Sequence, residues 1–202
     1  MKKHNIPQGS TEWLHKRKGV VSGTVLKGIM GTPKARLEAF YEVLAERLTT
    51  GVEEDYENAM DRGLRLEEDG IASFELETGK SVERIGLCES DENSNIANSP
   101  DGLIGDTEAI EVKCMGGKNH VKMWLTNEVP DEYEWQAIQY FVVNEKLEKL
   151  YFVGYNPDIP VHSLHIIELN RGEVEEKIEK AKIAQKVFLG EVEEKLKEII
   201  KI

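Results

Sequence analysis

The segment 97–114, ANSPDGLIGDTEAIEVKC, constrains the fold most, because it places two charges on a strand that should otherwise be buried. Residues 108–114 follow a Gly-Asp turn signal and read as the second strand of a hairpin. Side chains alternate along a strand, so Glu111 and Lys113 share one face while Val112 lies on the other. A buried charge without a partner is costly. This face must therefore present its two charges to each other, to water or to a metal ion.

An acidic residue before the hairpin turns this charged face into a candidate metal site. When the hairpin folds back, Asp101 is expected to approach Glu111. Two carboxylates and the backbone carbonyl of Val112 form a hard oxygen site, which suits Mg²⁺ or its substitute Mn²⁺ better than zinc. Lys113 beside them can orient a water nucleophile or stabilise a pentacovalent phosphate. The set predicts metal-dependent phosphodiester hydrolysis, but D-x9-E-x-K is a degenerate pattern in a chain with 32% charged residues.

A third carboxylate is expected on a helix at 57–77, which ends at a Thr-Gly stop. The apolar stripe of this helix consists of Met60, Leu64, Ile71 and Phe74. Glu67 lies within that stripe, so it is expected to point towards the core and to complete or support the metal site. Alternatively, Glu67 only flanks the stripe, and Glu68 or Glu75 is equally well placed.

A second helix, expected at 132–147, carries the polar residues that could assist such a site. Gln136 and Tyr140 are four residues apart and therefore share a face, while Gln139 lies on a neighbouring face. An inward-facing glutamine can bridge a metal-bound water or a scissile phosphate. The alternative is a half-exposed polar position on a packed helix.

The order of elements predicts one α/β (α+β) domain over 1–202, with a mixed central sheet flanked by helices. A short capped helix around Trp13 precedes turns at Gly19 and Gly23, and a charged amphipathic segment at 173–202 closes the chain. This segment forms one helix, or two if Gly190 interrupts it. It packs on its own domain or makes an oligomer contact. The remaining expected elements are a helix at 34–49 and strands at 82–88, 95–99, 102–104, 108–114, 150–155 and 161–169.

The charge balance excludes a protein that coats DNA broadly. The chain has 26 Lys and Arg against 38 Asp and Glu, a formal net charge of −12, whereas such a protein carries a basic stripe. Much of the acidity falls in the 53–57 run and the 173–198 helix, and the local cations are Lys16, Arg17 and Lys18. DNA binding should therefore be narrow and should depend on a divalent metal.

The sequence also suggests where the protein acts. The longest apolar stretch, 138–143, is far short of a bilayer span, and the N-terminus lacks the apolar region of a secretory signal, so we expect a cytoplasmic protein. Cys88 and Cys114 form no CxxC pair, which weighs against a zinc ribbon, a redox pair or an iron–sulfur cluster. Both are expected to be reduced, partly buried thiols.

Taken in order, these motifs resemble the PD-(D/E)xK nucleases, and most closely the phage lambda exonuclease and YqaJ-type viral recombinase family. The resemblance extends from Gln8 to about Glu168. QGSTEWLHKRKGVVSGT is similar to the N-terminal signature of that family, GLRLEEDGIASFELETG to its helix with a metal-binding Glu, and SPDGLIGDTEAIEVKC to its catalytic hairpin. Each motif is weak alone, but their order is specific. The implied fold is a restriction-endonuclease-like core.

The resemblance assigns roles to individual residues. It implies that Asp101 and Glu111 bind the metal with support from Glu67, and that Lys113 orients or activates the attacking water with help from Gln136 or Gln139. The residues that it places on the DNA strand or its terminal phosphate are Arg17, Ser22 or Thr24, Ser99 and, on the Q-x3-Y helix, Tyr140.

The implied activity is degradation of one strand of a linear duplex from its end, 5′ to 3′. The 3′ overhang would pass to a single-strand annealing protein in phage-type recombination. Some members of the family are ring-shaped trimers, so a homo-oligomer is expected from the resemblance alone.

Other activities remain compatible with the residues. A structure-specific or site-specific endonuclease could use the same metal core. A non-catalytic binding module could present the acidic surface to protein partners, although Glu111 and Lys113 on an apolar strand weigh against it. A CRISPR-adaptation nuclease is disfavoured, because its iron–sulfur cluster needs four cysteines and the chain has 2.

Overall fold

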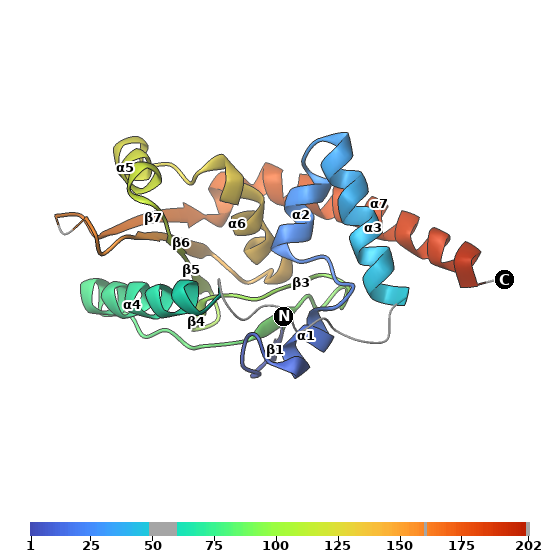
Figure 1. Ribbon diagram of the computed structural model, residues 1–202, viewed down its shortest axis with the longest axis horizontal. Coiled ribbons are helices and arrows are strands. Elements are labelled where there is room, and N and C mark those ends of the chain that lie inside the picture. Colours follow the sequence, from blue (N-terminus) through green and yellow to red (C-terminus); the bar gives the residue numbers. More distant parts are fainter. Residues whose placement is uncertain (49–59, 160, 201–202) are drawn as a thin grey trace.

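A computed structural model describes residues 1–48, 60–159 and 161–200, with side chains from residue 66 onward in the second range (Figure 1). Its centre is a four-stranded sheet in the order β4–β5–β6–β7. The two inner strands are parallel and both outer pairings are antiparallel, so the predicted mixed sheet is confirmed. The strands are β4 (Gly102–Ile104), β5 (Glu108–Cys114), β6 (Lys149–Tyr155) and β7 (Leu164–Asn170).

The side chains of β5 alternate between two hydrophobic clusters, one on each face of the sheet. Ile110 and Val112 pack against α4 (Met60–Thr78) through Ile71 and Phe74. Ala109, on the other face, joins the larger cluster formed with α6 (Asp131–Val143) and α7 (Arg171–Ile200). In Figure 1, α4 accordingly lies on the opposite side of the sheet from α6 and α7. The charged face of β5 therefore points towards α6. The predicted helix start at 57 lies outside the described residues, as do the side chains of Met60 and Leu64 and the 53–57 run.

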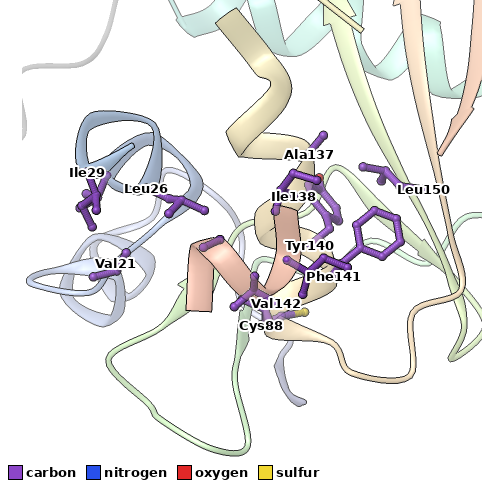
Figure 2. Packing of buried hydrophobic residues seen from close by; sticks show 14 of the residues in the cluster. Val21, Leu26, Ile29, Cys88, Ala137, Ile138, Tyr140, Phe141, Val142 and Leu150 are labelled. Carbon is purple, nitrogen blue, oxygen red and sulfur yellow. The ribbon is translucent and has the colours of Figure 1, made fainter. Parts of the chain in front are cut away.

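The N-terminal part packs against α6. α1 (Thr11–Arg17) and α2 (Gly23–Ile29) are followed by α3 (Pro33–Leu48). Figure 2 shows buried side chains of α2 and α6 together, with Cys88 and Leu150 in the same cluster. The expectation of a turn at Gly23 is wrong, because the Ser22 hydroxyl accepts a hydrogen bond from Val25 N and caps a helix there. Gly19, with a φ of 70°, does form a turn.

Several elements differ from the sequence-based expectation. A small antiparallel sheet joins β1 (Lys2–His4), β2 (Leu87–Glu89) and β3 (Ala97–Asn98), so the strand expected at 82–88 is shorter and begins later. α5 (Gly117–Thr126) is an additional helix. α7 continues through Gly190 as one helix, whose buried residues Val174, Ile178 and Val192 confirm that it packs on its own chain.

Two remaining expectations concern the cysteines and the bilayer. Cys88 is buried, and burial raises the pKa of its thiol to about 12. Cys114 is exposed rather than partly buried, because it follows the last core position of β5. Among the described helices, none has both the length and the apolarity that crossing a membrane requires.

Candidate active site

Glu111 is a buried charged side chain of the sheet, and several neighbours hold its carboxylate in place. It is only 1% exposed, although it lies in the middle of β5. Its Oε1 accepts a hydrogen bond from Gln136 Nε2 at 2.7 Å and forms an ion pair with Lys113. Its Oε2 accepts a hydrogen bond from the Tyr140 hydroxyl. The predicted shared face of Glu111 and Lys113 is thus observed, and α6 supplies two further donors to it.

The hairpin brings Asp101 to the same place. Gly102 pairs with Ile110, so the preceding Asp101 lies beside the continuation of β5. Asp101 Oδ2 accepts a hydrogen bond from Val112 N at 2.7 Å, and Asp101 N donates to the Tyr140 hydroxyl at 3.2 Å. One tyrosine hydroxyl therefore contacts both the Asp101 main chain and the Glu111 carboxylate.

Negative charge is crowded at this point. Burial, together with the charges of Glu111 and Glu67, raises the pKa of Asp101 well above its usual range. Burial also raises the pKa of Glu67, against the lowering effect of Arg84. For Lys113, burial alone would lower the pKa, but the carboxylates of Glu111 and Asp101 outweigh it and raise the pKa. Three carboxylates therefore share a region whose nearest cations are one lysine and one arginine.

The position of Glu67 favours it over its two neighbours on α4. Its electrostatic partners include Glu111 and Lys113, which places it at the edge of the site. Glu68 is instead largely exposed, and Glu75 Oε1 accepts a hydrogen bond from Val82 N at 2.7 Å. Of the alternatives weighed from the sequence, Glu67 is the carboxylate that α4 brings closest to the chemistry.

Arg84 is a neighbour of the site that the sequence analysis did not identify. Its Nη1 donates to the Asp101 carbonyl oxygen at 2.6 Å and lies 3.9 Å from Glu67 Oε1, and its Nη2 forms an ion pair with Glu68. Arg84 is one of two cations, with Lys80, between an acidic helix and the SPDG segment, which is the signal that the sequence offers.

The two glutamines of α6 have different surroundings. Gln136 contacts Glu111, as described above. Gln139 is 0% exposed, and its Nε2 donates to Val21 O at 2.9 Å and to Gln185 Oε1 at 3.1 Å. Gln136 is therefore the glutamine at the carboxylates, whereas Gln139 joins α6 to the N-terminal segment and to α7.

Tyr140 is buried beside the two acidic residues. It is 3% exposed, and its hydroxyl bonds Glu111 and accepts from Asp101. Its expected contact with the DNA strand stays a prediction, and its burial was not foreseen because a helical i, i+4 spacing fixes a face but not the depth of burial. In the structure it positions the two acidic residues.

The N-terminal residues predicted to hold phosphate approach the site through Gly23. A Cβ at Gly23 would lie 3.0 Å from Gln136 Cγ, so the start of α2 is packed directly on the glutamine that binds Glu111. Thr24, the next residue, is exposed. Ser22 is 6% exposed and uses its hydroxyl as the helix cap, so Thr24 is the more accessible of the two.

Arg17 and Ser99 both contact Trp13. The Arg17 guanidinium lies over the indole ring, 4.7 Å from its centroid, and Trp13 Nε1 donates to Ser99 Oγ at 3.1 Å. Ser99 is two residues before Asp101, so this cluster adjoins the hairpin of β4 and β5. Lys16 forms an ion pair with Glu89 at 3.8 Å.

The donor set fits a hard divalent cation that keeps several waters. Within the described ranges, no three His, Cys, Asp or Glu side chains converge closely enough to hold a metal alone. Mg²⁺ is commonly held by one or two carboxylates plus water, and Asp101 and Glu111 supply two. Burial first, and then the charges of Glu111 and Glu67, raise the pKa of Asp101, and a bound cation would offset both effects. The Val112 side chain lies in the apolar cluster, so only its backbone carbonyl could contribute.

Comparisons with known proteins give a consistent result. A comparison with curated proteins found no match. The alkaline exonuclease LHK-Exo of Laribacter hongkongensis, also solved in complex with dAMP, is 27% identical, with a TM-score of 0.86 over 95% of this chain and 97% of that one. A phage-related exonuclease of Haemophilus somnus 129PT shares the fold, with 16% identity and a TM-score of 0.59 over 88% of this chain and 96% of that one.

The family is shown by the sequence itself. Residues 12–146, about two thirds of the chain, match the model of the YqaJ-like viral recombinase domain. The matched span includes α4, the hairpin of β4 and β5, and Gln136 of α6. The resemblance noted from the motifs is therefore confirmed, and the chain belongs to the YqaJ-like viral recombinase domain family.

Proposed function

We propose that this chain is a Mg²⁺-dependent exonuclease that degrades the ends of linear double-stranded DNA, formed by a single domain. One observation carries the proposal: the buried Glu111 carboxylate is held by Gln136, Lys113 and Tyr140 directly beside Asp101. Family membership and the similarity to an alkaline exonuclease that has been solved with dAMP, a mononucleotide, support the same activity.

The residues divide the chemistry between them. A divalent cation at Asp101 and Glu111 would polarise a water molecule and neutralise charge on the scissile phosphate. Gln136 and Tyr140 hold the Glu111 carboxylate in one orientation, which removes the need to reorganise it during the reaction. Lys113 Nζ would orient the attacking water and donate to the charge that develops on the phosphate. Arg17 and Thr24 would hold the terminal phosphate of the strand.

A nuclease assay with matched lysine variants tests this proposal. Linear duplex is incubated with wild type, Lys113→Ala or Lys182→Ala, in Mg²⁺ and in chelator. Lys182 is a suitable control because it also pairs with a glutamate, Glu145 at 3.0 Å, and its side chain is 28% exposed against 22% for Lys113. We expect Lys113→Ala to lose at least about 100-fold in rate and Lys182→Ala to keep its activity. Full activity of Lys113→Ala would rule out this mechanism.

Relaxed circular DNA separates the proposal from the endonuclease alternative. An exonuclease needs an end, so wild type should leave relaxed circles intact under conditions that consume the linear form. Cleavage of the circles in Mg²⁺ would identify an endonuclease on the same metal core. Saturable Mn²⁺ binding that is lost in Asp101→Ala would argue against a non-catalytic module.

The proposal extends to the direction of digestion and the fate of the product. We infer 5′ to 3′ degradation in the cytoplasm, leaving a 3′ overhang for a single-strand annealing protein. Support comes from the match to a viral recombinase domain. With 5′-labelled and 3′-labelled duplexes, the 5′ label should be released first. Release of the 3′ label first would show that digestion runs 3′ to 5′.

We also infer a homo-oligomer, and specifically a trimer. Support comes from large apolar side chains that remain exposed on two adjacent helices: Leu37 (47%) and Tyr41 (55%) on α3, and Val187 (53%) on α7. Sedimentation equilibrium should give three times the 22.9 kDa mass of one chain. A monomer mass at micromolar concentration would contradict the trimer.

A further inference from the structure

Arg84 links two parts of the site that are separate in the sequence. It lies between α4 and β2, and its guanidinium reaches both α4 and the segment before β4. Nη1 donates to the Asp101 carbonyl oxygen at 2.6 Å and lies 3.9 Å from Glu67 Oε1. Nη2 forms an ion pair with Glu68. The catalytic roles proposed above make no use of this residue.

Arg84 holds the carbonyl oxygen of Asp101, a polar group that β5 and α6 leave to another partner. The Asp101 side chain is held by Val112 N, and its main-chain N–H is held by the Tyr140 hydroxyl, so both of these contacts come from the β5 and α6 side. Its carbonyl oxygen is held by Arg84, which is in turn paired with carboxylates of α4. Among the described residues, the Arg84 side chain thus joins the Asp101 main chain to α4.

The rest of α4 has little freedom to compensate. A Cβ at Gly70 would lie 2.8 Å from Val112 Cγ1, so the helix backbone touches β5 one turn after Glu67. This contact sets the distance between helix and strand. The planar guanidinium, with donors fixed in a fork, is suited to hold a carbonyl and carboxylates at the same time.

We propose that Arg84 is a positioning residue, which holds the Asp101 main chain and the Glu67 carboxylate in the places where they can bind or support the divalent cation of the site. The proposal rests on the metal-dependent function proposed above. Arg84 is a cation and does not bind the metal itself. It acts through the two acidic residues, as partners in the outer shell of metal sites do when they orient the ligands.

Two substitutions separate this role from a simple effect of charge. Removal of a cation near a metal site would by itself strengthen metal binding, because the repulsion is lost. Arg84→Lys keeps the charge and loses the fork, whereas Arg84→Met loses both. If Arg84 positions the ligands, both variants bind the metal more weakly. If only its charge matters, Arg84→Lys binds as wild type does and Arg84→Met binds more tightly.

Arg36 provides the matched control. It pairs α3 with α7 through Glu191 Oε2 at 2.7 Å, and its side chain is 35% exposed against 37% for Arg84. Arg36→Met therefore removes a similar arginine–carboxylate pair without touching the carboxylates of the site.

The test is a Mn²⁺ titration of the DNA-free protein, followed by electron paramagnetic resonance of free Mn²⁺, with thermal unfolding in chelator for each variant. We expect both Arg84 variants to lose about 10- to 100-fold in Mn²⁺ affinity while Arg36→Met binds as wild type does. In the nuclease assay, the Mg²⁺ concentration that gives the half-maximal rate should rise in both Arg84 variants by the same factor as the loss of Mn²⁺ affinity. Their KM for DNA should stay unchanged, and saturating Mg²⁺ should restore their rate.

Three results would overturn the proposal. The first is a wild-type isotherm for Arg84→Lys, and the second is an equal loss in Arg36→Met. The third is a raised KM for DNA with an unchanged isotherm, which would make Arg84 a phosphate contact. If wild type itself binds no Mn²⁺, the metal-dependent function fails and this role falls with it. Binding by wild type that is abolished in Asp101→Ala, together with unaffected Arg84 variants, would overturn the role of Arg84 alone.

Discussion

Gly23 lies against Gln136, with only 3.0 Å between the place of a Cβ on Gly23 and Gln136 Cγ. Gln136 in turn donates to Glu111, so the start of α2 and the centre of β5 are joined through one side chain. This contact connects the N-terminal segment, with Arg17 and Thr24, to the carboxylates. A strand end held by that segment would then lie next to the hydrolytic centre.

Gly23→Ala tests this connection. The added methyl must displace Gln136, whose Cα is 3.3 Å from the Cβ position and cannot move easily. We expect kcat/KM to fall by about tenfold, or about 1.4 kcal/mol of transition-state stabilisation. Gly190→Ala is the control, because nothing lies within 4 Å of its Cβ position. It should keep full activity and gain up to about 1 kcal/mol from helix propensity. Equal activity of Gly23→Ala and wild type would refute the connection.

Tyr140→Phe removes the hydroxyl that contacts both acidic residues. Glu111 and the Asp101 N–H each lose a buried partner, so the free energy of unfolding should fall by about 1–3 kcal/mol. Urea unfolding monitored by circular dichroism measures this change. Tyr41→Phe keeps the ring that the proposed oligomer contact would use and removes a hydroxyl at a position that is 55% exposed, so it should stay within about 0.5 kcal/mol of wild type. A stability loss no larger than that of the control would mean that the hydroxyl is not a structural partner.

Asp101→Asn should stabilise the metal-free protein at neutral pH. Burial and the neighbouring carboxylates raise the pKa of Asp101, so its folded form keeps a proton to higher pH than the unfolded chain does. The folded state then binds more protons, and wild-type stability falls as pH rises from about 3.9 through the raised pKa. Asparagine carries no charge and its side-chain oxygen can still accept from Val112 N.

Thermal unfolding in chelator at pH 4 and pH 8 measures this effect. The variant should unfold about 2–4 °C above wild type at pH 8, which is about 1 kcal/mol in a chain of this length, and the gap should narrow towards pH 4. Mg²⁺ at 100 times its Kd should add about 2.7 kcal/mol to wild type and much less to the variant. If Asp101→Asn were less stable than wild type at pH 8 without metal, the raised pKa of Asp101 and its destabilising effect would be contradicted.

The local geometry of the site was predictable from the sequence. Alternation along 108–114 correctly placed Glu111 and Lys113 on one face, because a strand fixes this face by its two-residue period. The turn at Gly105 brought Asp101 back to the strand. The i, i+4 spacing of Gln136 and Tyr140 placed both side chains on Glu111.

Features that depend on contacts distant in sequence were not predictable. β1 forms only because Lys3 pairs with Cys88 across the chain. α2 contains two glycines and owes its stability to its cap and to packing on α6, neither of which raises a periodic signal. Arg84 has neighbours from α4 and from the hairpin that only the folded chain brings together. The burial of Tyr140 likewise depends on the surrounding elements that pack over it in the folded chain.

The proposed function requires that Asp101 and Glu111 together hold a divalent cation for hydrolysis of DNA from its ends. Mononucleotide release from a linear duplex by wild type, Glu111→Gln and Glu168→Gln, in Mg²⁺ and in chelator, tests it most directly. Glu168 is the control, because it pairs with Lys149 at the surface and is 51% exposed. We predict that wild type and Glu168→Gln release mononucleotides in Mg²⁺ but not in chelator. The rate of Glu111→Gln should fall by more than the about 10–100-fold that loss of an outer-shell partner of a metal ligand costs. Release in chelator, or equal rates for Glu111→Gln and wild type, would contradict the account.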